Sequence, residues 1–257
     1  MMYGTASRMQ YTLIDGLQKL LSKALSVLAA WLLVRIIDHG GFRDLALSVG
    51  WSRGLMGSLI ALIVGLVVSG IAILAGDGIG LLSNTGFGES FHEQSVTLLI
   101  LSIVLSIVFA AIYAVGMNTL WFGYLLRSLS GRPVIGVVVV SLVPALVSLL
   151  PAPTSRFDPS ILALMAQSTP EAVGVGLASA VMVLALRSVW PSVGIAVGAR
   201  LISLVSPGAM TSPSAATAVS QSAITGALFA VAALVTALLM GRHRWQQVAH
   251  VGPFATT

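Results

Sequence analysis

Charged residues and cysteine are scarce in this sequence. Only 8% of the 257 residues are charged and none is a cysteine, whereas a soluble domain carries about 25% charge. So little charge cannot cover a water-facing surface, which excludes an ordinary soluble globular protein. The lack of cysteine excludes disulfides, cysteine–zinc sites and thiol catalysis. The net charge of +5 comes from basic residues that stand singly, a pattern that does not indicate nucleic-acid binding.

Apolar residues fill most of the chain instead. They make up 57% of the sequence, and several apolar runs approach the roughly 20 residues that an α-helix needs to cross a membrane. Short alternating strands are absent, which argues against a transmembrane barrel. The N-terminus has no short hydrophobic core followed by a small-residue cleavage site, so we expect no removable signal peptide. The sequence predicts an all-α, polytopic integral membrane bundle of helices.

The apolar runs predict about seven transmembrane helices. The expected spans are residues 24–37, 55–74, 95–116, 134–150, 171–186, 189–205 and 223–240. The third continues without a breaker, so one helix is expected to reach about Leu129. The first is either an interfacial helix followed by a short span, or one long tilted helix. The predicted regions are an N-terminal tail and amphipathic helix (1–24), a transmembrane domain (25–241) and a C-terminal tail (242–257).

The charges in the connecting segments predict an orientation. One set of loops carries arginines, and the intervening loops carry acidic residues. The arginines are Arg43, Arg53, Arg127, Arg132, Arg187, Arg242 and Arg244, and the acidic residues are Asp77, Glu89, Glu93 and Asp158. The positive-inside rule places the arginine loops in the cytoplasm. We therefore expect a bacterial inner-membrane protein with a cytoplasmic C-terminus.

Two stretches have the frame of an intramembrane enzyme motif, MNTLWFGYLLRSL at 117–129 and SVWPSVGIAVGAR at 188–200. With the intervening SLVPALVS, they resemble the CAAX-protease and bacteriocin-processing family of intramembrane metalloproteases. Members of that family read approximately E-E-x-x-F-R-G-x-L, then S-x-x-F-x-x-x-H, then S-L-W-P-x-x-x-x-H-x-x-x-N. The resemblance covers about residues 40–205. The matching positions include Gly123, Leu125, Ser141, Ser188, Trp190 and Pro191.

The positions that carry the family's chemistry do not match. Met117 and Asn118 replace the two glutamates, Phe122 the arginine, Pro144 and Ser148 the second motif's Phe and His, and Ala196 and Arg200 the last His and Asn. A metalloprotease needs imidazole or carboxylate ligands and a carboxylate base. The resemblance therefore implies the family's fold with an inactive centre, without catalytic residues, metal or cofactor.

Several of these residues allow two interpretations. An arginine within a span is costly without a partner, so Arg200 either contacts a ligand or partner, with Asn118 and Ser148, or reaches a hydrated cavity or interface. Asn118 shares a helical face with Phe122 and is expected to make an interhelical hydrogen bond. Ser148 is expected to be a small packing residue. Gly194 and Gly198 form a GxxxG step, which predicts helix packing, with an oligomer contact as the alternative.

The function predicted from these observations is non-catalytic. We expect an accessory or scaffold subunit of a membrane complex, with other membrane subunits and lipids as partners. It would bind a partner helix or lipid-like ligand in the former active-site cavity. One alternative is an active intramembrane metalloprotease whose catalytic residues lie elsewhere in the chain. Another is the membrane subunit of a transporter.

Overall fold

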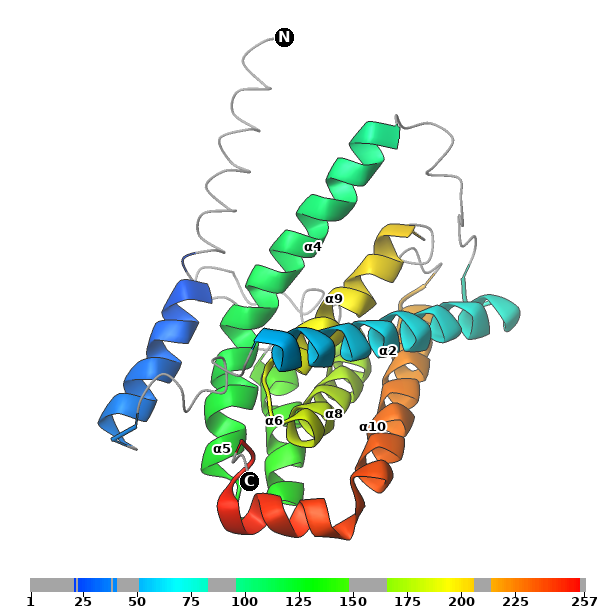
Figure 1. The fold of residues 1–257 in the computed structure, drawn as a ribbon. Coiled ribbons are helices and arrows are strands. Elements are labelled where there is room, and N and C mark those ends of the chain that lie inside the picture. Colours follow the sequence, from blue (N-terminus) through cyan, green and yellow to red (C-terminus); the bar gives the residue numbers. More distant parts are fainter. Residues whose placement is uncertain are drawn as a thin grey trace, which may run out of the picture.

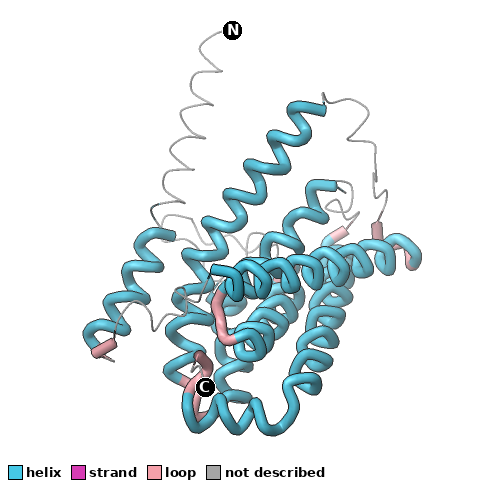
Figure 2. The backbone as a smooth tube through the Cα atoms, in the orientation of Figure 1, coloured by secondary structure: helices cyan, strands magenta, loops and turns pink. Residues whose placement is uncertain are grey.

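The computed structural model describes residues 21–40, 51–82, 96–147, 166–205 and 214–254, apart from Ser22 and Asp38. Every regular element in these ranges is a helix, which confirms the predicted all-α class (Figures 1 and 2). After a helical stretch at 23–36 the elements are α2 (Trp51–Gly78), α4 (Val96–Asn118), η2 (Thr119–Leu125), α5 (Leu126–Ser128), α6 (Pro133–Val147), α8 (Thr169–Leu186), α9 (Trp190–Val205) and α10 (Ala215–Val251).

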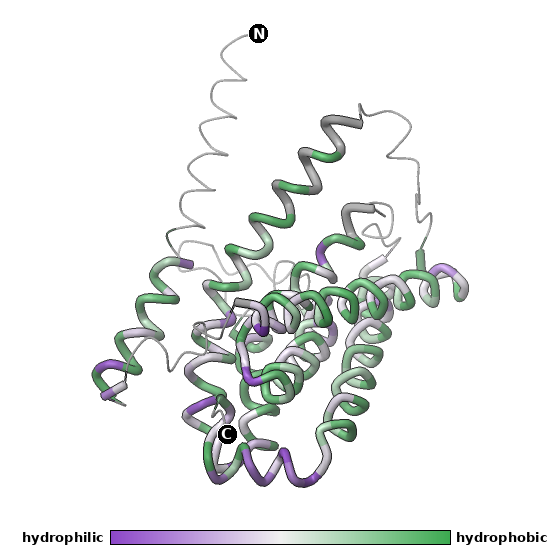
Figure 3. Tube along the Cα trace, in the orientation of Figure 1, coloured by the Kyte–Doolittle hydropathy of each residue, from purple (hydrophilic) through white to green (hydrophobic). Residues whose placement is uncertain are grey.

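Three of the described helices are long and apolar enough to cross a membrane. They are Ser52–Gly78, Thr169–Leu186 and Ala216–Val251, and shorter apolar helices cover Pro133–Val147 and Trp190–Ile202. Apolar residues dominate these segments in Figure 3. Leu238 and Leu239 on α10 are 71% and 82% exposed, which suits hydrocarbon rather than water. The helices support a transmembrane protein, whereas the count of about seven spans stays a prediction.

Two parallel helix pairs organise the bundle. In the first, Gly54 of α2 faces Trp190 at the start of α9, and Gly70 faces Ile202 near its end. In the second, the backbone N–H of Glu171 on α8 donates to Ser222 Oγ on α10 at 3.1 Å. Gly174 and Gly226 bring the backbones of α8 and α10 into direct contact one turn further along. Small residues thus allow the helices of both pairs to approach closely, as expected where close packing drives helix association in membranes.

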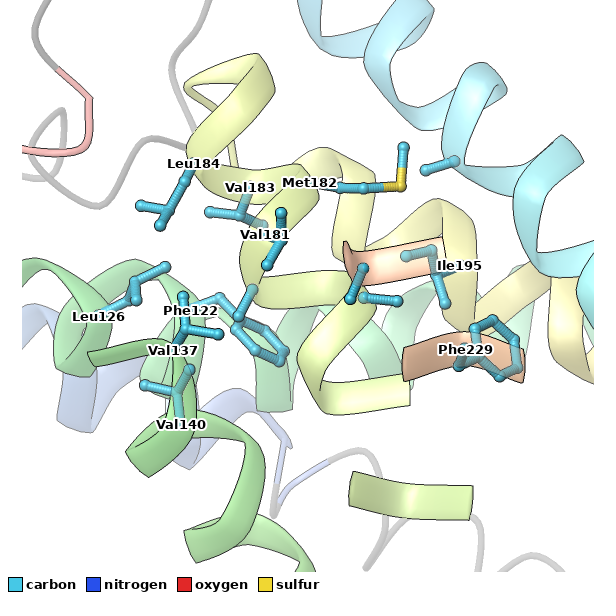
Figure 4. Packing of buried hydrophobic residues seen from close by; sticks show 14 of the residues in the cluster. Phe122, Leu126, Val137, Val140, Val181, Met182, Val183, Leu184, Ile195 and Phe229 are labelled. Carbon is cyan, nitrogen blue, oxygen red and sulfur yellow. The ribbon is translucent and has the colours of Figure 1, made fainter. Parts of the chain in front are cut away.

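The main hydrophobic core lies where η2, α6 and α8 meet. Phe122 and Leu126 contact Val137 and Val140 from α6 and the stretch Val181–Leu184 from α8 (Figure 4). Phe229 of α10 and Ile195 of α9 complete this cluster and are fully buried. A second cluster joins α4 to α9 through Ala114, Val193 and Val197. Buried residues of the motifs are divided between these two clusters.

The last helix differs from its prediction at both ends. The predicted span ran from Ala223 to Met240, whereas α10 runs from Ala215 to Val251 with a kink at Gly241 (φ 68°, ψ 162°). This left-handed φ favours glycine. Helix α10 starts early because Ser214 caps it: the Ser214 side chain accepts from Thr217 N, and Thr217 Oγ1 accepts from Ser214 N. The predicted C-terminal tail is therefore helical as far as Val251.

The Ser214 cap supplies a first test of the structure. Replacing Ser214 with alanine is expected to lower the free energy of unfolding by about 1 kcal/mol, because an N-terminal N–H of α10 loses its acceptor. Ser220→Ala is the matched control, since the Ser220 hydroxyl donates only to Ala216 O within the same helix. Thermal unfolding of both variants in the same detergent measures the difference. Equal midpoints would contradict the capping role.

Candidate functional site

The first motif lies where the helix changes its hydrogen-bonding pattern. Helix α4 ends at Asn118, the π-helix η2 runs from Thr119 to Leu125, and α5 continues to Ser128. The predicted continuous helix is present, but its middle is not α-helical. A π-helix bonds residue i to i+5 and shifts the direction of the side chains that follow, and such segments are frequent at functional sites. Because η2 begins between Asn118 and Phe122, the α-helical spacing used for their predicted common face does not apply there, and that common face stays a prediction.

The side chains of this segment divide between core and partly exposed positions. Phe122 is only 5% exposed and packs in the main core (Figure 4). Met117 and Asn118 are half-buried. Trp121 packs against the same core, and its indole Nε1 is buried with no hydrogen-bond partner in the described part of the chain. Buried donors are rarely left unpaired, so Trp121 is the most unusual group of the first motif.

The third motif builds the junction between α8 and α9. Arg187 ends α8 in the left-handed conformation (φ 56°), and Ser188 Oγ then accepts a hydrogen bond from Trp190 N at 3.3 Å. Pro191 lies in the first turn of α9, where its missing N–H costs no helix hydrogen bond. Trp190 and Pro191 pack on Gly54 and Gly57 of α2. Ser188, Trp190 and Pro191 thus have structural roles in starting α9.

The second motif is described only in part. Ser141 is buried on α6, donates to Val137 O at 2.6 Å, and lies against Gly176 of α8. Pro144 lies inside α6 and is half-buried. Ser148, the expected replacement for the family's histidine, lies outside the described residues. The second motif therefore contributes helix packing through Ser141.

The remaining replaced positions lie on α9. Ala196 packs beside the cluster that joins α9 to α4, whereas Phe122 belongs to the main core. Arg200 is exposed on α9, one helical turn beyond Ala196. The described contacts therefore place Phe122 and Ala196 in separate clusters. Among the described residues, no three His, Cys, Asp or Glu side chains form a group that could hold a metal ion.

Gly194 and Gly198 face α2 within the same chain. A Cβ added at Gly194 would overlap the Ser58 carbonyl oxygen, and one added at Gly198 would overlap that of Leu62. The facing stripe on α2 contains Gly57, Ala61 and Gly65, with small residues at every fourth position. Our sequence analysis missed this stripe, although the same small-xxx-small spacing could have revealed it.

A cluster missed by the sequence analysis ties the end of α8 to the end of α10. Arg187 Nη2 and Arg244 Nη1 both donate to Gln247 Oε1, each at 2.9 Å. Arg244 Nη2 also donates to Leu184 O at 2.9 Å and to Pro253 O at 3.3 Å. Leu184 lies in the last turn of α8, whose carbonyls lack partners within the helix. Arg244 thus caps α8 and holds the C-terminal segment against it.

The described geometry offers packing and hydrogen-bonding groups at the motif positions and a separate arginine cluster at the end of α8. Comparisons of the chain with models of known protein families, with curated proteins and with solved structures find no match.

Proposed function

We propose that this chain is a catalytically inactive membrane protein with a fold like that of the CAAX-protease and bacteriocin-processing family. It serves as an accessory or scaffold subunit of a larger membrane complex. Its partner is a helix of another membrane subunit or a lipid-like chain, bound beside the first motif. The proposal includes about seven spans in a bacterial inner membrane and a cytoplasmic C-terminus.

The observation that carries this proposal is that the motif residues serve in packing and helix capping. Phe122, Ser141 and Pro191 are buried packing residues, and Ser188 caps a helix. The positions that should hold two glutamates carry Met117 and Asn118, whose side chains supply neither a carboxylate ligand nor a general base. Motifs that have packing residues but no metal ligands and no general base favour a binding function over catalysis.

A second observation supports binding at the first motif. The π-helical segment holds a buried indole N–H on Trp121 that has no partner among the described residues, while the adjacent Asn118 is partly exposed. In a membrane, a side-chain donor or amide can hydrogen-bond a carbonyl of a neighbouring helix. The half-buried Asn118 amide is the group with which a partner helix would form such a hydrogen bond at the first motif.

The test is purification from native membranes in mild detergent, with mass spectrometry of proteins, lipids and metals together. We expect a stoichiometric partner or a retained lipid-like molecule, without equimolar zinc. A photo-crosslinking residue at Asn118 should capture that partner, whereas the same residue at the exposed Leu74 of α2 should not. A lone protein with equimolar zinc would overturn the proposal and support the active metalloprotease. Equal capture from both positions would exclude binding beside the first motif.

A further inference from the structure

The described acidic residues and a group of basic residues lie at opposite ends of the bundle. Among the described residues only Asp77 and Glu171 are acidic. Glu171 lies beside Ser222 near the start of α10, and Asp77 follows Gly76, which contacts Gln221 there. The opposite end holds a group of basic residues, which we call the basic end. It consists of Arg127, Arg132, Arg187, Arg242, His243 and Arg244, carried by or next to α5, α6, α8 and the last turns of α10 (Figures 1 and 3).

The last part of α10 is an amphipathic helix that covers this end. After the kink at Gly241 the chain turns across the bottom of the bundle in Figure 1. Val248 on its inner side is fully buried, and Trp245 packs on the main core and donates its indole N–H to Ala237 O at 3.1 Å. Arg242 and His243 on the outer side are exposed. A helix with one apolar and one basic face is typical of a membrane interface.

Two guanidinium groups at the basic end lie unusually close together. Arg187 and Arg244 donate to the same oxygen, Gln247 Oε1, at 2.9 Å each. Within the described residues the hydrogen-bond partners of Arg244 are neutral: the Gln247 amide and the carbonyls of Leu184 and Pro253. Two positive charges in such proximity create a field that attracts anions. The exposed Arg242 extends this field to the surface.

The apolar surface beside the basic end identifies the kind of anion. Leu238 and Leu239, immediately before the kink, are among the most exposed apolar residues in the described part of the chain. The exposed Arg242 follows Leu239 three residues later. A molecule that meets both features has a hydrocarbon chain attached to a negatively charged group. We propose that the basic end binds the phosphate headgroups of anionic phospholipids, with their acyl chains along Leu238 and Leu239.

The experiment uses the full chain in mild detergent and native mass spectrometry. Phosphatidylglycerol and phosphatidylcholine with identical acyl chains are titrated separately. We expect phosphatidylglycerol to bind more tightly, with an affinity that falls as salt rises. Arg242→Gln should weaken phosphatidylglycerol binding about fivefold, the effect of one basic residue near an anionic surface. Arg242→Lys should retain most of the affinity, because it keeps the positive charge.

The control is Arg200→Gln, which removes an exposed arginine outside the basic end and should leave phosphatidylglycerol binding unchanged. Equal affinities for the two lipids, or an equal loss in the two glutamine variants, would overturn the proposal. Inorganic phosphate supplies the last arm of the experiment. If it displaces phosphatidylglycerol at similar concentrations, the basic end binds free anions rather than lipids. This inference does not depend on the proposed function, because the two binding sites and their variants are different.

Discussion

Replacing Gly194 with alanine is expected to destabilise the protein by about 1–3 kcal/mol or more, the cost of overpacking a closely packed contact. The added methyl group would overlap the Ser58 carbonyl oxygen and approach the Ala61 side chain to 3.0 Å. A backbone carbonyl within a helix cannot move aside as a flexible side chain can, so α2 and α9 must separate. Because alanine favours a helix over glycine by about 1 kcal/mol, the net loss measures the contact between the two helices.

Thermal unfolding in detergent is the measurement, with Gly78→Ala as the matched control. Gly78 is the last residue of α2, and a Cβ added there meets nothing within 4 Å. The control should be neutral or slightly stabilising. Equal midpoints for the two variants would show that α2 and α9 do not pack as closely as described. Gly198→Ala should repeat the effect of Gly194→Ala, because its Cβ would overlap the Leu62 carbonyl oxygen.

Replacing Arg244 with glutamine is expected to release the C-terminal segment from the bundle. The shorter side chain cannot reach both Leu184 O and Pro253 O, which Arg244 Nη2 now contacts at 2.9 Å and 3.3 Å. A polar group left without its partner costs about 1–3 kcal/mol. Val248 and Phe254, which pack on the main core, would then be held only by their apolar contacts.

Limited proteolysis with chymotrypsin reports this release, because Trp245 lies in the released segment and is partly buried in the intact protein. We expect faster cleavage at Trp245 and a lower unfolding midpoint in Arg244→Gln. Arg242→Gln is the matched control, since Arg242 is exposed and makes none of the contacts of Arg244. Unchanged cleavage in Arg244→Gln would mean that the apolar face alone holds the segment.

Much of the helical framework could be predicted from local sequence. The expected spans 171–186 and 189–205 correspond closely to α8 and α9, because Arg187 and the Ser188–Pro191 stretch interrupt the apolar run. The span 55–74 was too short by four residues at each end, since α2 runs from Trp51 to Gly78. Hydropathy marks the apolar part of a helix, but polar turns continue it as long as the backbone can hydrogen-bond.

The candidate site could be predicted only as a set of residues. Motif spacing selected Phe122 and Ala196, but their separation into two packing clusters depends on how η2 packs on α6 and α8 and how α9 packs on α4. The π-helical segment was also invisible in the sequence, because TLWFGYL contains no proline and reads as an ordinary helix. A change in backbone hydrogen bonding of this kind is decided by packing around the helix, not by the local residues alone.

The sequence by itself determined the class of protein, since 8% charge and long apolar runs leave only a helical membrane protein. It also contained the small-residue spacing at Gly194 and Gly198. The tertiary structure alone decided that this stripe faces α2 and that Arg187 shares Gln247 with Arg244 across 60 residues of sequence. The physical reason is range: hydropathy and helix signals act over a few turns, whereas contacts between distant helices depend on the packing of the whole bundle.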